Sequence, residues 1–178
     1  MLVRMRKTVA DYLAYDEERV ELIDGEFLVT PAPSLRHQEI SMNLSLILGP
    51  QVRRLKLGKL FAAPFDAILS PHDVVQPDLL FLSTESLKCA SPRLEGPPDV
   101  AIEILSKGSR RRDLVRKKKL YLEHGVPEYW IVDPDAATVA VLVRSAAGWV
   151  ERGIFKRGEI ATSAVMKGVA VPVTEVFE

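Results

Sequence analysis

Two apolar runs with a helical segment between them constrain the fold of this chain most strongly. The first, residues 99–105, reads Asp-Val-Ala-Ile-Glu-Ile-Leu, and the second, residues 128–133, reads Glu-Tyr-Trp-Ile-Val-Asp. The run 99–105, together with the run at 78–82, is rich enough in apolar residues to predict central strands that are covered on both faces. A helix is predicted between them, from about Ser109 to Glu123, with Gly125 as its end. The order strand, helix, strand predicts an α/β fold with a mixed central sheet flanked by helices.

The N-terminal part is expected to add a short helix, a hairpin and a long helix. The capping box Thr8–Asp11 opens the short helix. Asp24-Gly25 is a strong hairpin signal between strands predicted at residues 19–23 and 26–30. Ser34 is expected to cap a long helix that runs to about Leu57 and ends at Gly58.

Further short apolar runs predict the remaining strands, at residues 60–63, 66–69, 78–82 and 138–144. The tail from Ala146 contains several glycines and is expected to form peripheral C-terminal strands. At 178 residues, the chain is predicted to form a single domain over residues 1–178.

Two acidic residues in these strands carry the first chemical hypothesis. Glu103 stands in the middle of an apolar run, where a carboxylate is costly to bury unless it is paired or binds a cation. Asp78 follows Gln76-Pro77 at the head of another apolar strand. If the two strands are neighbours, both carboxylates can hold one Mg²⁺ ion. The alternative is that Glu103 faces an edge or forms a salt bridge with a lysine of the following helix.

The charge distribution points to phosphate. The chain has 24 basic and 24 acidic residues, but residues 107–119 contain eight basic residues and one acidic residue, a local charge of +7. The remainder therefore carries −7, and the overall neutrality does not exclude nucleic acid. A basic segment directly after the Glu103 strand would attract phosphate beside the acidic residues. The alternative is a solvated helix face.

Helical spacing narrows the choice of a lysine within this segment. At about 100° per residue, Lys117 shares one flank with Asp113 and Tyr121 and stands at the border between core and solvent. Lys118 lies at the opposite edge of the apolar side of the helix. Either lysine can therefore point toward a strand carboxylate. That apolar side is expected to consist of Leu114, Val115, Tyr121 and Leu122.

Taken together, several motifs resemble the Uma-type restriction endonuclease family of the PD-(D/E)XK nuclease superfamily. The motifs are residues 21–26 (Glu-Leu-Ile-Asp-Gly-Glu), 63–66 (Ala-Pro-Phe-Asp), 76–78 (Gln-Pro-Asp), 98–106 and 111–134. The resemblance runs from about Thr8 to Phe177. It implies a restriction-endonuclease-like core carrying the N-terminal hairpin and the peripheral C-terminal strands.

The resemblance also assigns roles. Asp78 and Glu103 would be the metal ligands, with the backbone carbonyl of Ile104 as a third, and Lys117 would be the catalytic lysine. The superfamily usually has this lysine two residues after the second acid, where this chain has Leu105. The implied contacts to nucleic acid are Arg110, Arg111, Arg112, Arg116 and Lys118. Three more residues are candidates for an additional catalytic group, namely Glu26, His37 and Glu39.

The leading hypothesis is Mg²⁺- or Mn²⁺-dependent hydrolysis of DNA phosphodiester bonds by a homodimer. A second hypothesis is a nuclease fold that only binds nucleic acid, and a third is a protein-interaction module. No organic cofactor is expected, because the chain lacks a glycine-rich phosphate loop and a dinucleotide-binding fingerprint. The single cysteine, Cys89, and the absence of a run of membrane-spanning length favour a cytoplasmic protein without membrane contact.

Overall fold

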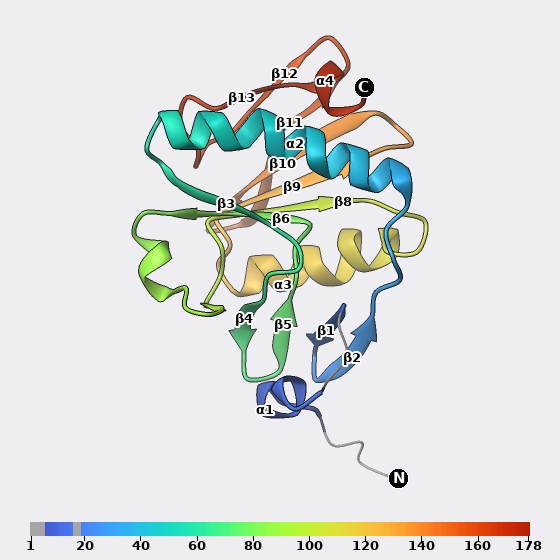
Figure 1. Ribbon diagram of the computed structural model, residues 1–178, viewed down its shortest axis with the longest axis vertical. Helices are drawn as coiled ribbons and strands as arrows, with labels where there is room; N and C mark the ends of the chain where they lie inside the picture. Colours follow the sequence, from blue (N-terminus) through green and yellow to red (C-terminus); the bar gives the residue numbers. More distant parts are fainter. Residues whose placement is uncertain (1–5, 16–18) are drawn as a thin grey trace.

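The computed structural model describes residues 6–15 and 19–178, so residues 1–5 and 16–18 of the predicted domain lie outside the description. Figure 1 shows a central sheet with helix α2 along one face and helix α3 along the other, and a second sheet beyond α3. The predicted mixed α/β sheet flanked by helices is therefore confirmed. Among the described residues, no helix is long and apolar enough to span a membrane.

The central sheet has six strands in the order β11-β10-β9-β8-β6-β3, and β8 and β9 are its parallel pair. Its strands are β3 (Gly58–Ala62), β6 (Leu79–Ser83), β8 (Val100–Ile104), β9 (Glu128–Asp133), β10 (Thr138–Ser145) and β11 (Gly148–Lys156). The second sheet has the order β2-β1-β5-β4-β7. Its strands are β1 (Val20–Ile23), β2 (Glu26–Val29), β4 (Ala67–Ser70), β5 (Asp73–Val75) and β7 (Leu94–Glu95).

The N-terminal elements follow the sequence signals closely. Helix α1 (Val9–Leu13) begins with the predicted capping box, in which the Thr8 hydroxyl accepts from the Asp11 amide and the Asp11 carboxylate accepts from the Thr8 amide. Strands β1 and β2 form the predicted antiparallel hairpin. Its turn residues Asp24 and Gly25 both have positive φ, which explains why Asp-Gly occurs there.

Helix α2 (Leu35–Arg54) begins after the predicted cap, Ser34, whose side chain accepts from the His37 amide. The prediction that it runs to Leu57 and ends at Gly58 is wrong. The helix ends at Arg54, and Gly58 is instead the first residue of β3. Gly58 has φ +152°, and a Cβ there would collide with the Leu82 carbonyl oxygen of the neighbouring strand β6. The glycine therefore permits close strand pairing rather than ending the helix.

The crossover from β8 to β9 contains an unexpected π-helical turn. The structure has η2 (Arg112–Lys117) as a π-helix that continues into α3 (Lys118–Glu123), where a regular helix was predicted. The widened turn keeps residues four apart on one side, so that Asp113, Lys117 and Tyr121 are all buried. Val115, predicted on the apolar side, is 60% exposed, and Lys117 lies in the core rather than at its border. Gly125 ends the helix with φ +81°, as predicted.

Two apolar layers cover the central sheet. The layer on the α2 side contains Val100, Ile102 and Ile104 of β8, and the layer on the α3 side contains Ala101 and Leu105. All five residues of β8 are buried, which confirms a central strand covered on both faces. By strand alternation, Glu103 belongs to the α3 side.

The C-terminal elements are peripheral, as predicted. Strand β11 is the edge strand of the central sheet, and β12 (Ile160–Thr162) and β13 (Ala170–Pro172) form a separate pair. Helix α4 (Val173–Val176) packs against α2, and Phe177 completes the apolar layer on that side. Between β6 and β7 the chain forms one 3₁₀ turn, η1 (Ser86–Cys89).

Candidate active site

Asp78 and Glu103 lie opposite each other on neighbouring strands. Strands β6 and β8 pair antiparallel with Leu79 opposite Ile102, and one further step in this register brings Asp78 opposite Glu103. Directly opposed residues of an antiparallel pair project from the same face of a sheet. The expectation that the strands carrying the two acids are neighbours is therefore confirmed, and both acids are on the α3 side.

Asp78 is held at the end of its strand by two contacts. Its Oδ2 atom accepts a hydrogen bond from the Ile104 amide at 2.7 Å and lies 3.2 Å from Nε2 of His37 on α2. Burial lowers the pKa of His37, but the hydrogen bond and the charge of Asp78 outweigh it, so the pKa is raised. The structure thus brings His37, one of the candidates for an additional catalytic group, directly to Asp78.

Glu103 is buried and paired. Its Oε1 atom accepts from Nζ of Lys117 at 2.8 Å and from the hydroxyl of Tyr121 at 2.6 Å. Burial raises the pKa of Glu103 well above its ordinary value, although the Lys117 charge acts in the opposite direction. The salt bridge that the sequence left open as an alternative is therefore present, with Lys117 and not Lys118 as the partner.

Lys117 lies between carboxylates of two different sheets. Its Nζ atom is 2.8 Å from Oε1 of Glu103 in the central sheet and 2.8 Å from Oε1 of Glu21 in the second sheet. Burial alone would lower the pKa of Lys117, but the charges of Glu103, Glu21 and Asp113 outweigh it and raise the pKa above its ordinary value. Lys117 is therefore an ammonium group held in a fixed place.

Sequence reasoning missed Glu21 and Asp113 as members of this cluster. Glu21 lies in β1, whose four residues are all buried, and its Oε1 atom also accepts from the Gln76 amide at 2.8 Å. The sequence contained a signal for Glu21, because it is a carboxylate within a predicted apolar strand, like Glu103. Burial raises the pKa of Asp113, whose Oδ1 atom lies 4.0 Å from Lys117 and 3.6 Å from Nε of Arg112.

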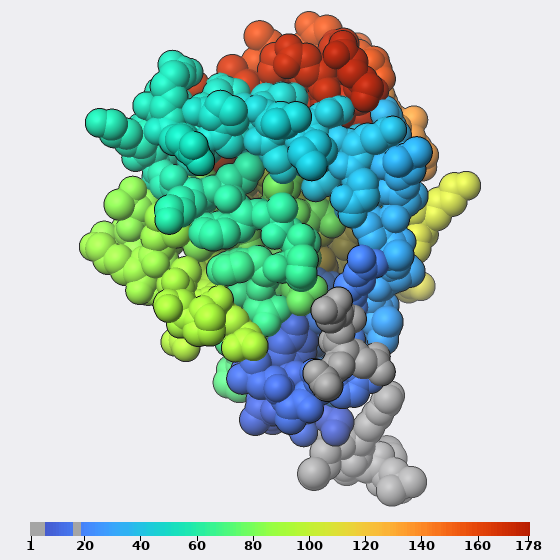
Figure 2. Space-filling view, in the orientation of Figure 1, coloured from blue at the N-terminus to red at the C-terminus, as the bar shows by residue number. Residues whose placement is uncertain are grey.

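Five of these residues line one cleft of about 290 Å³. Its wall includes Glu21, His37, Asp78, Glu103 and Lys117. The surface is hollowed between the start of α2, in blue and cyan, and the green segment that contains β3 to β6 (Figure 2). The three residues expected to form the catalytic centre, Asp78, Glu103 and Lys117, therefore share a single solvent-accessible site.

The residues present fit a hard divalent cation. No described residue hydrogen-bonds to Oδ1 of Asp78 or to Oε2 of Glu103, so each carboxylate keeps one oxygen for a ligand. The Leu105 amide donates to β9, so the trans peptide turns the Ile104 carbonyl toward the β6 side, where Asp78 lies. One or two carboxylates are the usual protein ligands of Mg²⁺, and waters and substrate phosphates complete its coordination. Within residues 6–15 and 19–178, no group of three or more His, Cys, Asp or Glu side chains is arranged to hold a metal. A cation here would therefore be held by the two carboxylates and the backbone carbonyl, not by three side chains.

The charges of the cluster support the same conclusion. The carboxylates of Glu21, Glu103 and Asp113 lie within 4.0 Å of the permanent cations Lys117 and Arg112, whereas Asp78 contacts His37. In addition, Oε2 of Glu21 and Oδ1 of Asp113 are buried without a hydrogen-bond partner among the described residues. Carboxylate oxygens that lack a partner in a buried acidic cluster favour a bound cation.

The basic residues expected to contact nucleic acid differ in their availability. Arg110 forms a two-pronged salt bridge with Asp133, at 2.7 and 3.1 Å, which raises the pKa of Arg110 and lowers that of Asp133. Arg116 contacts Glu26 and Asp24 in the hairpin. Both are thus committed to contacts within the chain.

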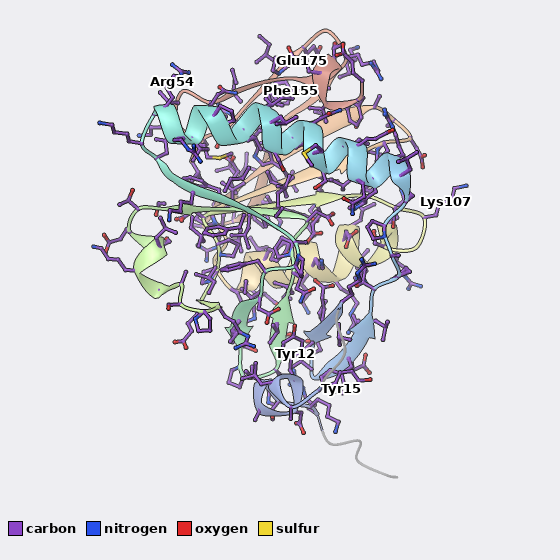
Figure 3. The ribbon with its side chains drawn as sticks, viewed as in Figure 1. Tyr12, Tyr15, Arg54, Lys107, Phe155 and Glu175 are labelled. Carbon is purple, nitrogen blue, oxygen red and sulfur yellow. The ribbon has the colours of Figure 1, made fainter. Side chains whose placement is uncertain are left out.

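The other basic residues are distributed around the cleft. Arg112 lines it and donates to the Thr30 hydroxyl. Arg111 is exposed, and Lys118 is half-buried. Lys107, just beyond the end of β8, projects into solvent (Figure 3).

Glu26 and Glu39 are not among the residues that line the cleft. Glu39 is two positions after His37 on α2, which turns it about 200° away from the cleft, and it pairs with Arg36 at 3.4 Å. Glu26 lies beside the hairpin turn, whereas the cleft contacts the open end of the hairpin at Arg19 and Thr30. Of the three candidates for an additional catalytic group, the structure brings only His37 to the site.

Comparison with known proteins agrees with this geometry. A family model described as Uma2, putative restriction endonuclease, matches residues 9–174. The chain is also similar to a crystal structure of a putative nuclease belonging to DUF820 from Anabaena variabilis ATCC 29413. The identity is 19%, the match covers 96% of this chain and 97% of that chain, and the TM-score is 0.80, which confirms the predicted nuclease-like fold. No curated protein matches the chain.

Proposed function

Because the chain belongs to the Uma2 family, we propose that it is an endonuclease that hydrolyses DNA phosphodiester bonds with a divalent metal ion, Mg²⁺ or Mn²⁺. The observation that carries the proposal is the placement of Asp78 and Glu103 opposite each other in one cleft, each with one carboxylate oxygen free. Asp78, Glu103 and the Ile104 carbonyl would hold the metal. When bound, the ion supplies Lewis-acid polarisation of the phosphate and a more acidic water.

Lys117 would stabilise the negative charge that develops on the phosphate. Its raised pKa keeps it protonated at neutral pH, so it acts as a charge and a hydrogen-bond donor rather than as a base. Glu21 and Glu103 hold the ammonium at 2.8 Å on two sides, which fixes its position before the substrate arrives. His37, within reach of Asp78, would orient that carboxylate toward the metal.

Backbone contacts would come from the basic segment. Arg112 lines the cleft and Arg111 is exposed, and both would contact phosphates near the site without reading sequence. Arg110, Arg116 and Lys118 are not among the cleft-lining residues, and the first two have carboxylate partners within the chain, so we assign all three a smaller part in binding. We also propose a homodimer in the cytoplasm, to be tested by light scattering and cell fractionation.

Plasmid nicking in the presence of Mg²⁺ or Mn²⁺ tests the proposal. We expect the wild type to nick, and Asp78→Ala and Glu103→Gln to lose nicking while keeping their circular dichroism spectra. Glu39→Ala is the matched control, because Glu39 is an exposed carboxylate outside the cleft lining. Equal nicking by the wild type and both site variants would overturn the assignment of the acids.

A nuclease fold that only binds nucleic acid is the alternative, favoured by the salt bridge between Lys117 and Glu103. Calorimetric titration with Mn²⁺ separates the two functions. A nuclease requires a metal site that Asp78→Ala abolishes, whereas a binding module shows salt-dependent DNA binding that this substitution leaves intact.

A further inference from the structure

The groups assigned to chemistry lie at the floor of the cleft. The side chains of Lys117 and Glu103 are only 2% and 3% exposed, and the side chain of Asp78 is 21% exposed. A phosphate that lies across the mouth of the cleft cannot contact such buried groups. The reacting part of the substrate must therefore enter the cleft.

Exposed apolar side chains form the rim. They come from three separate segments: Pro31 and Ala32 before α2, Met42 on α2, and residues 62–64 (Ala-Ala-Pro) after β3. Met42 is 60% exposed. Apolar groups gathered from several segments around an acidic floor indicate a surface that a ligand covers.

The occupant must combine a phosphate with an apolar face, and a single-stranded nucleotide does so. A double helix keeps its base faces stacked inside and presents phosphates and groove edges, so it offers little to an apolar rim. An unpaired base presents a flat face that packs on apolar side chains. A cleft of about 290 Å³ is at the lower end of small-molecule sites, which suits one nucleotide rather than a helix.

We propose that this cleft binds an unpaired nucleotide of single-stranded DNA, with the base against the apolar rim and the phosphate at the acidic floor. The proposal rests on the nuclease function above and specifies its substrate. Two cations of the cleft wall support it, because Arg19 and Arg112 both lie beside Thr30 and add positive charge for the phosphates of the strand. Arg111 and Lys107 are both exposed and follow the β8 strand, so they extend the positive charge to adjoining phosphates. Figure 3 shows Lys107 projecting into solvent.

Fluorescence anisotropy with a labelled oligodeoxynucleotide tests this proposal. The same strand is used alone and annealed to its complement as a blunt duplex, with Ca²⁺ as the divalent ion. We expect the single strand to bind at least about tenfold more tightly than the duplex. Met42→Glu places a carboxylate on the rim and should weaken single-strand binding about tenfold.

Leu46→Glu is the matched control, because Leu46 is 65% exposed on the same helix, one turn from Met42, and is not among the cleft-lining residues. It should leave binding within about twofold of the wild type. Duplex binding as tight as single-strand binding, equal effects of the two substitutions, or no binding of either DNA would overturn the proposal.

The same oligonucleotides in Mn²⁺ separate this proposal from the nuclease function. Rim-dependent single-strand binding without cleavage would refute the nuclease function and keep the nucleotide site. Equal cleavage of duplex and single strand would refute the nucleotide site and keep the nuclease function. An unrelated apolar peptide is then added as a competitor. If it displaces the single strand from the wild type no better than from Met42→Glu, the rim does not bind apolar groups in general, which further supports nucleotide specificity.

Discussion

Replacing Lys117 by methionine is the most direct perturbation of the buried cluster. Methionine keeps the length of the side chain and removes the ammonium that lies 2.8 Å from both Glu21 and Glu103. Both carboxylates are 3% exposed, so water cannot replace the lost cation. Of the contacts to Glu103, the hydrogen bond from Tyr121 remains.

The expected loss is a difference between large contributions. At an effective dielectric constant of about 20, each pair at 2.8 Å contributes roughly 6 kcal/mol of gross attraction. In the wild type, removing the ammonium from water costs several kcal/mol, which offsets part of this attraction. The variant has no ammonium and avoids that cost. Removing one partner of a buried ion pair costs about 3–5 kcal/mol. We therefore expect Lys117→Met to lower the free energy of unfolding by about 3–5 kcal/mol at neutral pH.

This loss should depend on pH with a definite sign. Burial raises the pKa of Glu103 above that of an unfolded glutamate, and Lys117 lowers it, so removing the lysine raises it further. The folded variant then binds the Glu103 proton more tightly than the unfolded chain, and its stability increases as the pH falls toward the ordinary glutamate range. The wild-type lysine, whose pKa is raised, stays charged throughout this range. The loss should thus be largest in mild alkali and smaller in mild acid.

Urea unfolding followed by the fluorescence of Trp130 and Trp149, at about pH 8 and about pH 5, measures both quantities. Lys119→Met is the control, because Lys119 is 74% exposed on the same helix; it should change stability by less than about 0.5 kcal/mol. Adding Glu103→Gln to Lys117→Met should recover part of the loss. A loss below about 1 kcal/mol, or one that is the same at both pH values, would refute the reasoning.

Three further predictions concern substitutions of single residues. Tyr121→Phe removes the hydrogen bond to Glu103 and should cost about 1–3 kcal/mol in urea unfolding; an unchanged midpoint would contradict this. Arg111→Ala should weaken DNA binding and reduce its salt dependence more than Arg110→Ala does, because Arg110 is engaged within the chain; the reverse order in salt titrations would contradict it. Gly125→Ala should cost about 1 kcal/mol of thermal stability, because φ is +81° and no atom lies closer than 4.0 Å to an added Cβ.

The sequence predicts the elements that depend on local chemistry. Asp24-Gly25 fixes the hairpin and Ser34 the start of α2, because turn and cap preferences arise within a few residues. Sequence reasoning also singles out Asp78 and Glu103, since a carboxylate within an apolar strand requires a partner or a cation, although it left open whether their strands are neighbours. These parts of the site are visible before any tertiary contact is known.

The rest of the site depends on contacts that no local pattern encodes. The π-helical turn has no sequence signal here. Lys117 was therefore predicted at the border between core and solvent, whereas the structure buries it. Glu21 is a carboxylate within an apolar strand, which is a local signal, but its partner Lys117 is identified only when the hairpin packs beside η2. The end of α2 was misplaced because Gly58, a common helix-ending residue, is needed for strand pairing instead.

The shared lysine also has a consequence for the order in which activity can arise during folding. The contact with Glu103 closes 14 residues of chain, whereas the contact with Glu21 closes 96 residues. Long-range closures form late because their entropy cost must be met by structure already in place. A chain that has formed only the β8–α3–β9 unit would contain Glu103 and Lys117 without the Glu21 contact. In refolding experiments, the nicking activity that we propose should therefore appear after the central sheet has formed, so that partly folded chains would not nick DNA.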